Sequence, residues 1–367
     1  MAMDRLTTVL ALNSGSSSLK FGVYQVGAEA IETLASGEAQ ALGSAEASFS
    51  ADGIDGENLA DASIGGVMRR IEQWLQKAGL PALNAVGHRV VHGGPQLFKP
   101  CRIDDKVLEQ LNHASAFAPL HTPAALAVIT EARQHFNDLP QVACFDTGFH
   151  ADMPALAHTL ALPHRLREQG IRRYGFHGLS CASIVRQLGE ALPSRLVIVH
   201  LGNGASVTAV KQGRSVDTSM GLTPSGGIIM GTRSGDLDPG VLIYLMREQG
   251  MDAQALEQLI DHQSGLLGIS GVASDMRKLH ETASSDPQSA LAIEMFCQAA
   301  RKQIAAMVAV LEGLDLLVFT GGIGEHDTPV RQRICAGLGW LEVEGKVRVL
   351  PSLEDEEIAR LSARCMA

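Results

Sequence analysis

Short apolar runs alternate with longer amphipathic segments along most of the chain, which predicts alternating strands and helices. Seven runs rich in valine, leucine and isoleucine are expected to form strands: Thr8–Leu12, Leu19–Tyr24, Ala85–Val91, Val142–Phe145, Leu196–His200, Val207–Val210 and Leu314–Thr320. Five longer segments have helical spacing: Ala62–Ala78, Pro123–His135, Ala182–Leu192, Ala290–Leu311 and Glu354–Cys365. Residues 36–64, rich in small and acidic residues, are expected to form polar surface strands and loops. This alternation is typical of the α/β class.

Two stretches about half the chain apart share one pattern. VLALNSGSSSLKFGVY resembles VIVHLGNGASVTAV, and an ungapped alignment places Ser18 on Ser206. Each stretch has an apolar strand, a turn of glycine, serine and asparagine, and a second strand. The similarity favours two domains of like topology, whereas the alternative is two unrelated hairpins, since such turns are common.

Composition narrows the class of protein. At about 150 residues per domain, 367 residues suggest two domains or one large one. A net charge of −10 argues against a dedicated nucleic-acid binder, which needs a basic surface. No apolar run is long enough for a membrane-spanning helix, and the start of the chain reads as a strand rather than a signal peptide. Six scattered cysteines without a C-x-x-C pair argue against zinc and disulfides and fit a reducing cytoplasm.

Glycine-rich turns supply candidate phosphate sites. In Asn13–Lys20, small residues let backbone N–H groups approach a phosphate, and Lys20 adds a charge on the face opposite its apolar neighbours. His200–Ser206 has the same character, and Gly321–His326 is a glycine-rich turn that follows a strand and leads into a helix. No Walker A or G-x-G-x-x-G sequence is present. For each turn, a purely structural role is the alternative.

Charged residues beside glycines supply candidate catalytic groups. Arg233 lies in a polar run with two aspartates, where a planar cation suits a transferring phosphoryl group. Arg89 follows a strand and precedes a glycine pair, as in a clamp for carboxylate or phosphate. His121, Asp146 and His177 each end an apolar run beside small residues, although such a histidine is more often a satisfied core residue.

Nine segments in order from residue 10 to about 326 carry a resemblance: LALNSGSSSLKF, GHRVVHGG, APLHTPAAL, CFDTGFHADMP, RRYGFHGLS, HLGNGASV, DTSMGLTPSGGIIMGTRSGDLDPG, SGLLGISG and FTGGIGEH. With a weaker match, VLPSLEDEEIA, they resemble the acetate/propionate kinase family of the actin-like ATPase superfamily. The resemblance implies two duplicated actin-like (ribonuclease H-like) ATPase domains that close on a cleft. One is expected over 1–148 with the helix 355–367, and the other over 149–354.

The resemblance also implies the reaction and its site. The family transfers the γ-phosphoryl group of ATP reversibly to a short carboxylate and uses Mg²⁺. Its members are implied to be cytoplasmic homodimers that bind neither nucleic acid nor membranes. The catalytic residues implied are Arg89, His121, Asp146, His177 and Arg233, with Arg89 also binding the carboxylate. The acyl group would contact Val91, Leu120, Phe176 and Pro224. The nucleotide would contact Ser16, Ser18, Lys20, His200, Leu201, Gly202, Asn203, Gly204, Asp275, Met276, Arg277, Gly322, Ile323, Gly324, Glu325 and His326. Mg²⁺ would bind near Asn13 and Glu354.

The implied reaction agrees with physical expectation. A carboxylate is already ionised at pH 7, so it needs charge screening rather than a general base. Asp146, the family's assigned acid/base, is therefore expected to orient an arginine, a histidine or metal-bound water.

The chain departs from the family at several places. These include His326, where the family has asparagine, and the segment around Glu354, which is preceded by a short 339–351 region. Three alternatives stay open: a propionate or butyrate kinase, a non-catalytic nucleotide-binding regulator, and a sugar or polyol kinase of the same superfamily.

Overall fold

The computed structural model describes residues 6–15, 17–118 and 122–366. The chain divides into two compact units. The first unit comprises Met1–Gly148 and the C-terminal segment Leu353–Ala367, and the second comprises Phe149–Ser352. A central sheet of mixed strand direction organises each unit.

The sheet of the first unit has the strand order β5-β4-β3-β2-β1-β6-β8-β7. β1 pairs antiparallel with β2 and parallel with β6, and β6 pairs parallel with β8. The strands are β1 (Thr7–Ser14), β2 (Leu19–Val26), β3 (Ile31–Gln40), β4 (Ser48–Ala51), β5 (Ile54–Asn58), β6 (Ala85–Val90), β7 (Cys101–Arg102) and β8 (Gln141–Phe145). The helices are α1 (Ile64–Lys77), α2 (Asp105–Ala114), η1 (Ser115–Phe117), α3 (Thr122–His135) and α14 (Glu354–Arg364), with η2 (Gly148–His150) at the boundary.

Alternation of side chains assigns the two faces of this sheet. Leu10, Leu12 and Val86 lie in one core with buried side chains of α1 and α3. Residues of opposite parity, Asn13 and Arg89 among them, therefore point to the other face. The strand pattern thus already separates the core positions from the polar positions.

Helix α14 covers that other face. A Cβ atom added to Gly87 of β6 would lie 2.2 Å from Oγ of Ser362 and 2.8 Å from Cγ2 of Ile358. Only glycine permits this close approach between strand and helix. The last helix of the chain is therefore held on the face to which Asn13 and Arg89 point.

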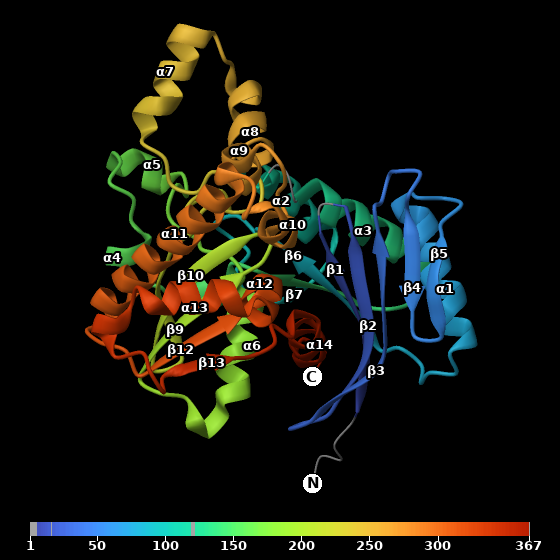
Figure 1. The fold of residues 1–367 in the computed structure, drawn as a ribbon. Helices are drawn as coiled ribbons and strands as arrows, with labels where there is room; N and C mark the ends of the chain where they lie inside the picture. The colour runs from blue at the N-terminus through green and yellow to red at the C-terminus, as the bar shows by residue number, and fades with distance from the viewer. Residues whose placement is uncertain (1–5, 16, 119–121, 367) are drawn as a thin grey trace. The chain divides into compact units, whose positions relative to one another are not determined.

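The sheet of the second unit has the order β11-β10-β9-β12-β13. Leu196 and Ile198 of β9 pack with α6 in one core, while Val197 and Val199 are buried on the opposite face, where α11 contacts the sheet. The strands are β9 (Arg195–Leu201), β10 (Ala205–Lys211), β11 (Arg214–Thr218), β12 (Leu316–Thr320) and β13 (Val347–Val349). The helices are α4 (Ala155–His158), α5 (His164–Glu168), α6 (Gly178–Leu188), η3 (Gly189–Ala191), α7 (Pro239–Gln249), α8 (Ala253–His262), α9 (Gly265–Ser270), α10 (Met276–Thr282), α11 (Pro287–Leu311), α12 (Gly321–His326), α13 (Thr328–Ala336) and η4 (Gly339–Leu341). Within this unit, α7 and α8 extend away from the sheet (Figure 1).

The two sheets share one topology. β3-β2-β1-β6-β8 in the first unit corresponds to β11-β10-β9-β12-β13 in the second, with antiparallel pairs followed by parallel pairs. The predicted like topology is confirmed, but the ungapped alignment is wrong at Ser18. Ser18 lies in the turn, whereas Ser206 is the second residue of β10 and pairs with His200. The second residue of β2 is Lys20, because the first turn is one residue longer.

The predicted strands and helices are all present, with small shifts of their ends. The helix expected over Ala182–Leu192 begins earlier, at Gly178, because His177 takes a left-handed conformation (φ 56°) and starts it. Gly321–His326 is itself helical rather than a turn before a helix. Helices α7 to α10 were not predicted. Among the described residues, no helix is long and apolar enough to cross a membrane.

Candidate active-site residues

In the first unit, three polar side chains lie where adjacent parallel strands end. Asn13 is near the end of β1, Arg89 near the end of β6, and Asp146 directly follows β8. The backbone N–H of Asp146 donates to the carbonyl of Val90, which continues the ladder by one residue (3.0 Å). The carboxyl ends of parallel strands are where α/β proteins bind ligands.

Arg89 and Asp146 form a buried ion pair. Nε and Nη2 of Arg89 donate to Oδ2 of Asp146 at 2.9 and 2.6 Å, and Asp146 is fully buried. Burial opposes the charge of Arg89, but the charges of Asp146 and Glu354 outweigh it, so the pKa of Arg89 is raised. Burial raises the pKa of Asp146, and Arg89 acts against that rise. The guanidinium is therefore a permanent, fixed cation.

Asn13 connects this pair to the first turn of α14. Its amide oxygen accepts from Nη1 of Arg89 (3.3 Å), and its amide nitrogen donates to Oδ1 of Asp355 (2.7 Å) and Oε2 of Glu354 (3.3 Å). Burial raises the pKa of Asp355, while Asn13 acts against the rise. Two carboxylates thus meet the predicted metal position, and Asp355 makes the shorter contact.

The other predicted residues of the first unit have simpler surroundings. Lys20 is exposed between two buried neighbours, as alternation predicts, and lines a pocket of about 460 Å³ together with Asp355. Val91 is buried, and Ser18 lies in the β1–β2 turn. Three predicted residues lie outside the described part of the chain: Ser16, Leu120 and His121.

In the second unit, His177 and Arg233 approach the same glycine. A Cβ atom added to Gly204 would lie 3.1 Å from Nε2 of His177 and 3.5 Å from Nη1 of Arg233. The imidazole of His177 is bound at Nδ1 by Oγ of Ser206 (2.9 Å) and stacks on His200 with 4.1 Å between ring centroids. Only a residue without a side chain fits this close approach of both side chains to the turn.

The backbone around Arg233 is fixed from several directions. Nη1 of Arg233 donates to the carbonyl of Pro224 (2.9 Å), and its own carbonyl accepts from the backbone N–H of Met230 (3.1 Å). The flanking aspartates hold backbone instead: Asp236 accepts from the N–H of Gly227 (2.7 Å), and Asp238 caps α7. These contacts fix the loop that carries the guanidinium of Arg233.

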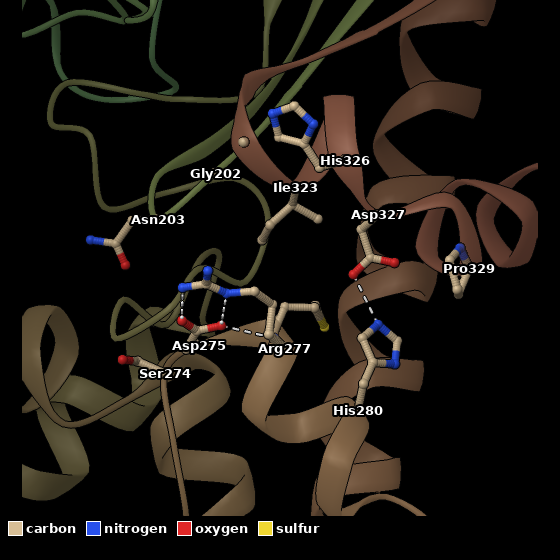
Figure 2. A pocket seen from close by; sticks show the side chains of 12 residues that line it. Gly202, Asn203, Ser274, Asp275, Arg277, His280, Ile323, His326, Asp327 and Pro329 are labelled. Atoms are coloured by element: carbon tan, nitrogen blue, oxygen red, sulfur yellow. Dashed lines mark hydrogen bonds and ion pairs between the residues drawn. The ribbon is translucent and has the colours of Figure 1, made fainter.

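A pocket of about 970 Å³ opens in this unit, lined by Gly202, Asn203, Ser274, Asp275, Met276, Arg277, His280, Gly322, Ile323, His326, Asp327 and Pro329. Figure 2 shows Asn203 at one end, Asp275 bound to Arg277 in the middle, and His280 bound to Asp327 at the other end. Nη2 of Arg277 donates to Oδ2 of Asp275 at 2.6 Å. The pocket has the size of a nucleotide-like ligand.

Some predicted nucleotide contacts support this pocket rather than line it. Leu201 and Gly324 are buried, and Oε1 of Glu325 accepts from the backbone N–H of Gly321 (3.0 Å) and of Ser352 (3.1 Å). Their backbone geometry shapes the wall, but within the described residues the lining does not include them.

Comparison with known proteins places the chain in a family. The model of the "Acetokinase family" matches residues 8–357. The chain belongs to the acetokinase family. An acetate kinase of Rhodopseudomonas palustris is 42% identical over 350 residues, covering 91% of this chain and 87% of the relative.

Solved structures of the acetokinase family share the fold. A propionate kinase of Francisella tularensis superposes with a TM-score of 0.90 at 35% identity, covering 98% of this chain and 99% of that one. An acetate kinase of Porphyromonas gingivalis gives 0.86 at 32% identity, covering 98% and 100%. The predicted class, two duplicated actin-like ATPase domains, is confirmed.

Two features of this acetokinase-family site were missed from the sequence. Asp355 was passed over because Glu354 aligned with the family motif, although four successive acidic residues open α14. The His280–Asp327 pair gave no local signal, because its members are far apart in sequence and the fold brings them together. Two further histidines of the first unit make structural contacts: Nε2 of His88 lies 2.7 Å from Oε1 of Gln141, and His92 stacks on Phe117.

Proposed function

We propose that this protein is an acetate kinase that transfers the γ-phosphoryl group of ATP reversibly to acetate by direct in-line attack. The observation that carries the proposal is the Arg89–Asp146 pair, a fixed cation at the strand ends of the first unit. Membership of the acetokinase family supports the reaction class, and the 970 Å³ pocket supports nucleotide binding. Each unit contributes a different charged or hydrogen-bonding group.

The acceptor requires a cation rather than a base. Acetate is ionised at pH 7, so its oxygen is already a nucleophile. The barrier is the repulsion between that anion and the polyphosphate. Arg89, whose pKa is raised, would bind the carboxylate and offset this repulsion without losing its own proton.

The second unit would supply the groups for the transferring phosphoryl. Arg233 and His177 both approach Gly204. Both side chains would therefore donate hydrogen bonds to the oxygens of the transferring phosphoryl group. Hydrogen-bond donors that are already in place stabilise the charge of a loose transition state without reorganising. The turn Gly202–Gly204 would hold the phosphates, and the pocket that begins at this turn would hold the nucleoside.

We also propose that the reaction uses Mg²⁺, because the oxygen atoms near Asn13 are of the kind that this ion prefers. Asn13, Glu354 and Asp355 offer oxygen ligands, and Mg²⁺ in such enzymes is held by one or two carboxylates together with substrate phosphates. The ion would neutralise phosphate charge when bound. We propose that Glu354 and Asp355 share this task and that Asn13 orients them.

Asp146 is proposed as a positioning residue. Its Oδ2 accepts two hydrogen bonds from Arg89, which fixes the plane of the guanidinium. The expected result for Asp146→Asn is a raised KM for acetate with an unchanged shape of the pH–rate profile. Loss of one proton-linked limb of that profile in Asp146→Asn would show that the carboxyl moves a proton.

The accepted acyl length would depend on the apolar side chains proposed to contact the acyl group. Val91 in the first unit, and Phe176 and Pro224 in the second, are buried and apolar. One methylene in an apolar pocket is worth about 1–3 kcal/mol, so acetate and propionate should differ by about tenfold to a hundredfold. Acetate is proposed as the preferred substrate, with propionate kinase as the alternative.

A cytoplasmic homodimer is also proposed. Helix α7 has no buried residue, although its sequence is largely apolar, and Ile243, Tyr244 and Met246 are about half exposed. Such a surface is typical of a protein interface. Sedimentation of Tyr244→Glu as a smaller species than the unaltered protein would support a second copy as the partner, and unchanged sedimentation would contradict it.

Acyl phosphate formation tests the proposal directly. The protein would be incubated with Mg·ATP and acetate, propionate, butyrate or glycerol, and acyl phosphate trapped with hydroxylamine. The expected result is product from acetate in preference to propionate, lost in Arg233→Ala. ATP binding without product from any carboxylate would instead favour the non-catalytic regulator, and phosphorylation of glycerol would favour a polyol kinase.

A further inference from the structure

The far end of the 970 Å³ pocket contains a histidine whose hydrogen-bonding role is fixed by a carboxylate. Nε2 of His280 on α10 lies 2.9 Å from Oδ2 of Asp327, and both residues line the pocket (Figure 2). The side chains are 29% and 12% exposed, so the pair is shielded yet reaches the pocket. Neither residue was expected to contact the nucleotide.

Both carboxylate oxygens of Asp327 have hydrogen-bond partners. Oδ1 accepts from the backbone N–H of Val330 at 3.0 Å and caps α13, while Oδ2 faces His280. An ionised carboxylate only accepts hydrogen bonds, so Nε2 of His280 must carry the proton. In the neutral imidazole, Nδ1 is then an acceptor, and any hydrogen bond from this ring to a ligand is one that the ligand donates.

The order of residues along the pocket places the pair at the base end. Gly202 and Asn203, the turn proposed to hold phosphates, lie toward one end, and Ile323 lies between them and the His280–Asp327 pair (Figure 2). His280 lies one helical turn beyond Met276, on the same face of α10. A nucleotide with its phosphates at the glycine turn would therefore extend its base toward His280.

We propose that His280, held by Asp327, determines base specificity by selecting a purine with a donor at position 6. Adenine carries an amino group there, whereas hypoxanthine carries a carbonyl that would face an acceptor. The inference rests on the proposed nucleotide site and deepens it. A polar group left facing a like group costs more than a lost contact, so discrimination of about tenfold or more is expected.

The test measures equilibrium binding of ADP, IDP and purine riboside diphosphate, all with Mg²⁺. The unaltered protein should bind ADP at least about tenfold more tightly than IDP, with the unsubstituted purine between them. His280→Ala should bring all three affinities close together. His280→Asn, with a thermal melting point compared with that of the unaltered protein, provides a second variant if His280→Ala does not fold.

Asp327→Asn is the decisive variant. The amide oxygen can still cap α13, while the amide nitrogen becomes a donor toward His280, so the ring must carry its proton on Nδ1 instead. The preference should then reverse in favour of IDP. Glu168→Gln is the matched control, because Glu168 pairs with the exposed His164 on α5, 3.4 Å away.

The outcomes separate this inference from the proposed function. Equal affinity of the unaltered protein for ADP and IDP, or an unchanged ratio in His280→Ala and Asp327→Asn, overturns the role of the pair while acyl phosphate formation still stands. Failure to bind any of the three nucleotides, with no acyl phosphate formed, overturns both.

Discussion

The two units have the same sheet topology but carry opposite chemistry at their strand ends. In the first unit, the ends of β1, β6 and β8 hold an ionic network in which Arg89, Asp146 and Asn13 are bound to each other. In the second, a glycine follows the last residue of both β9 and β12, and the stacked imidazoles of His177 and His200 and the 970 Å³ pocket lie nearby. The same sheet topology thus carries an ion pair at the strand ends of one unit, and glycine turns beside histidines and a pocket in the other.

The two units also differ in the groups that hold their arginine side chains. One carboxylate oxygen, Oδ2 of Asp146, accepts two hydrogen bonds from Arg89, which holds the guanidinium rigidly but neutralises part of its charge. Arg233, by comparison, donates to the backbone carbonyl of Pro224. We therefore expect the two arginines to respond differently to removal.

The largest effect is expected from comparing Arg233→Ala with Arg89→Ala. Loss of an arginine at a transferring phosphoryl costs about 10³-fold or more in kcat, so Arg233→Ala should act mainly on kcat. Arg89→Ala should act mainly on the KM for acetate, by about tenfold to a hundredfold, because it removes a charged hydrogen bond to the substrate. Steady-state kinetics of acetyl phosphate formation measures both, with exposed Arg165→Ala on α5 as control. A kcat-dominated loss for both variants would break the proposed division of roles.

The next effect concerns stability, because each unit contains a deeply buried histidine whose pKa is lowered. Burial lowers the pKa of His88 and of His150 from 6.5 to about 4, against the hydrogen bonds that they make. Since the unfolded chain takes up the proton first, this stability is present above pH 6.5 and is lost as pH falls toward 4. The loss is about 3 kcal/mol for each histidine.

Urea unfolding at pH 7 and pH 5 measures this effect. His88→Asn should flatten the pH dependence of the transition of the first unit, and His150→Asn that of the second. A pH dependence unchanged in both variants would show that other groups cause it.

A smaller effect is expected at the acidic start of α14, a feature of the first unit. Glu354→Gln and Asp355→Asn should each raise the Mg²⁺ concentration for half-maximal activity about tenfold, since both carboxylates meet Asn13. Glu356→Gln in the same helical turn is the matched control. A response from Asp355→Asn alone would move the metal position from the residue that the family motif suggested to its neighbour.

The sequence predicted the strands and helices well because their apolar spacing is local. It also singled out Arg89, Asp146, His177 and Arg233 as candidates, since each lies near glycines or other small residues at the end of an apolar run or in a polar loop. Helices α7 to α10 were missed because their apolar residues are partly exposed or spread over short segments. Contacts that depend on the fold could not be predicted: Asn13 meets Asp355 across more than three hundred residues.

The turn register was missed for a related reason. An ungapped alignment assumes equal turns, yet the β1–β2 turn is one residue longer than the β9–β10 turn, so the residue that matches Ser206 by strand position is Lys20. A charge in the first unit thus corresponds to a hydroxyl in the second.

The smallest predicted effect tests that correspondence. Oγ of Ser206 binds Nδ1 of His177 at 2.9 Å and fixes the imidazole beside Gly204. Ser206→Ala removes one hydrogen bond of about 1 kcal/mol, so kcat should fall about fivefold with an unchanged KM for ATP. Ser206→Thr keeps the hydroxyl and should restore most of the rate. If Ser206→Ala raised the KM for ATP instead, the hydroxyl would bind phosphate directly, as Lys20 is proposed to do, and the two hairpins would be alike in chemistry as well as in topology.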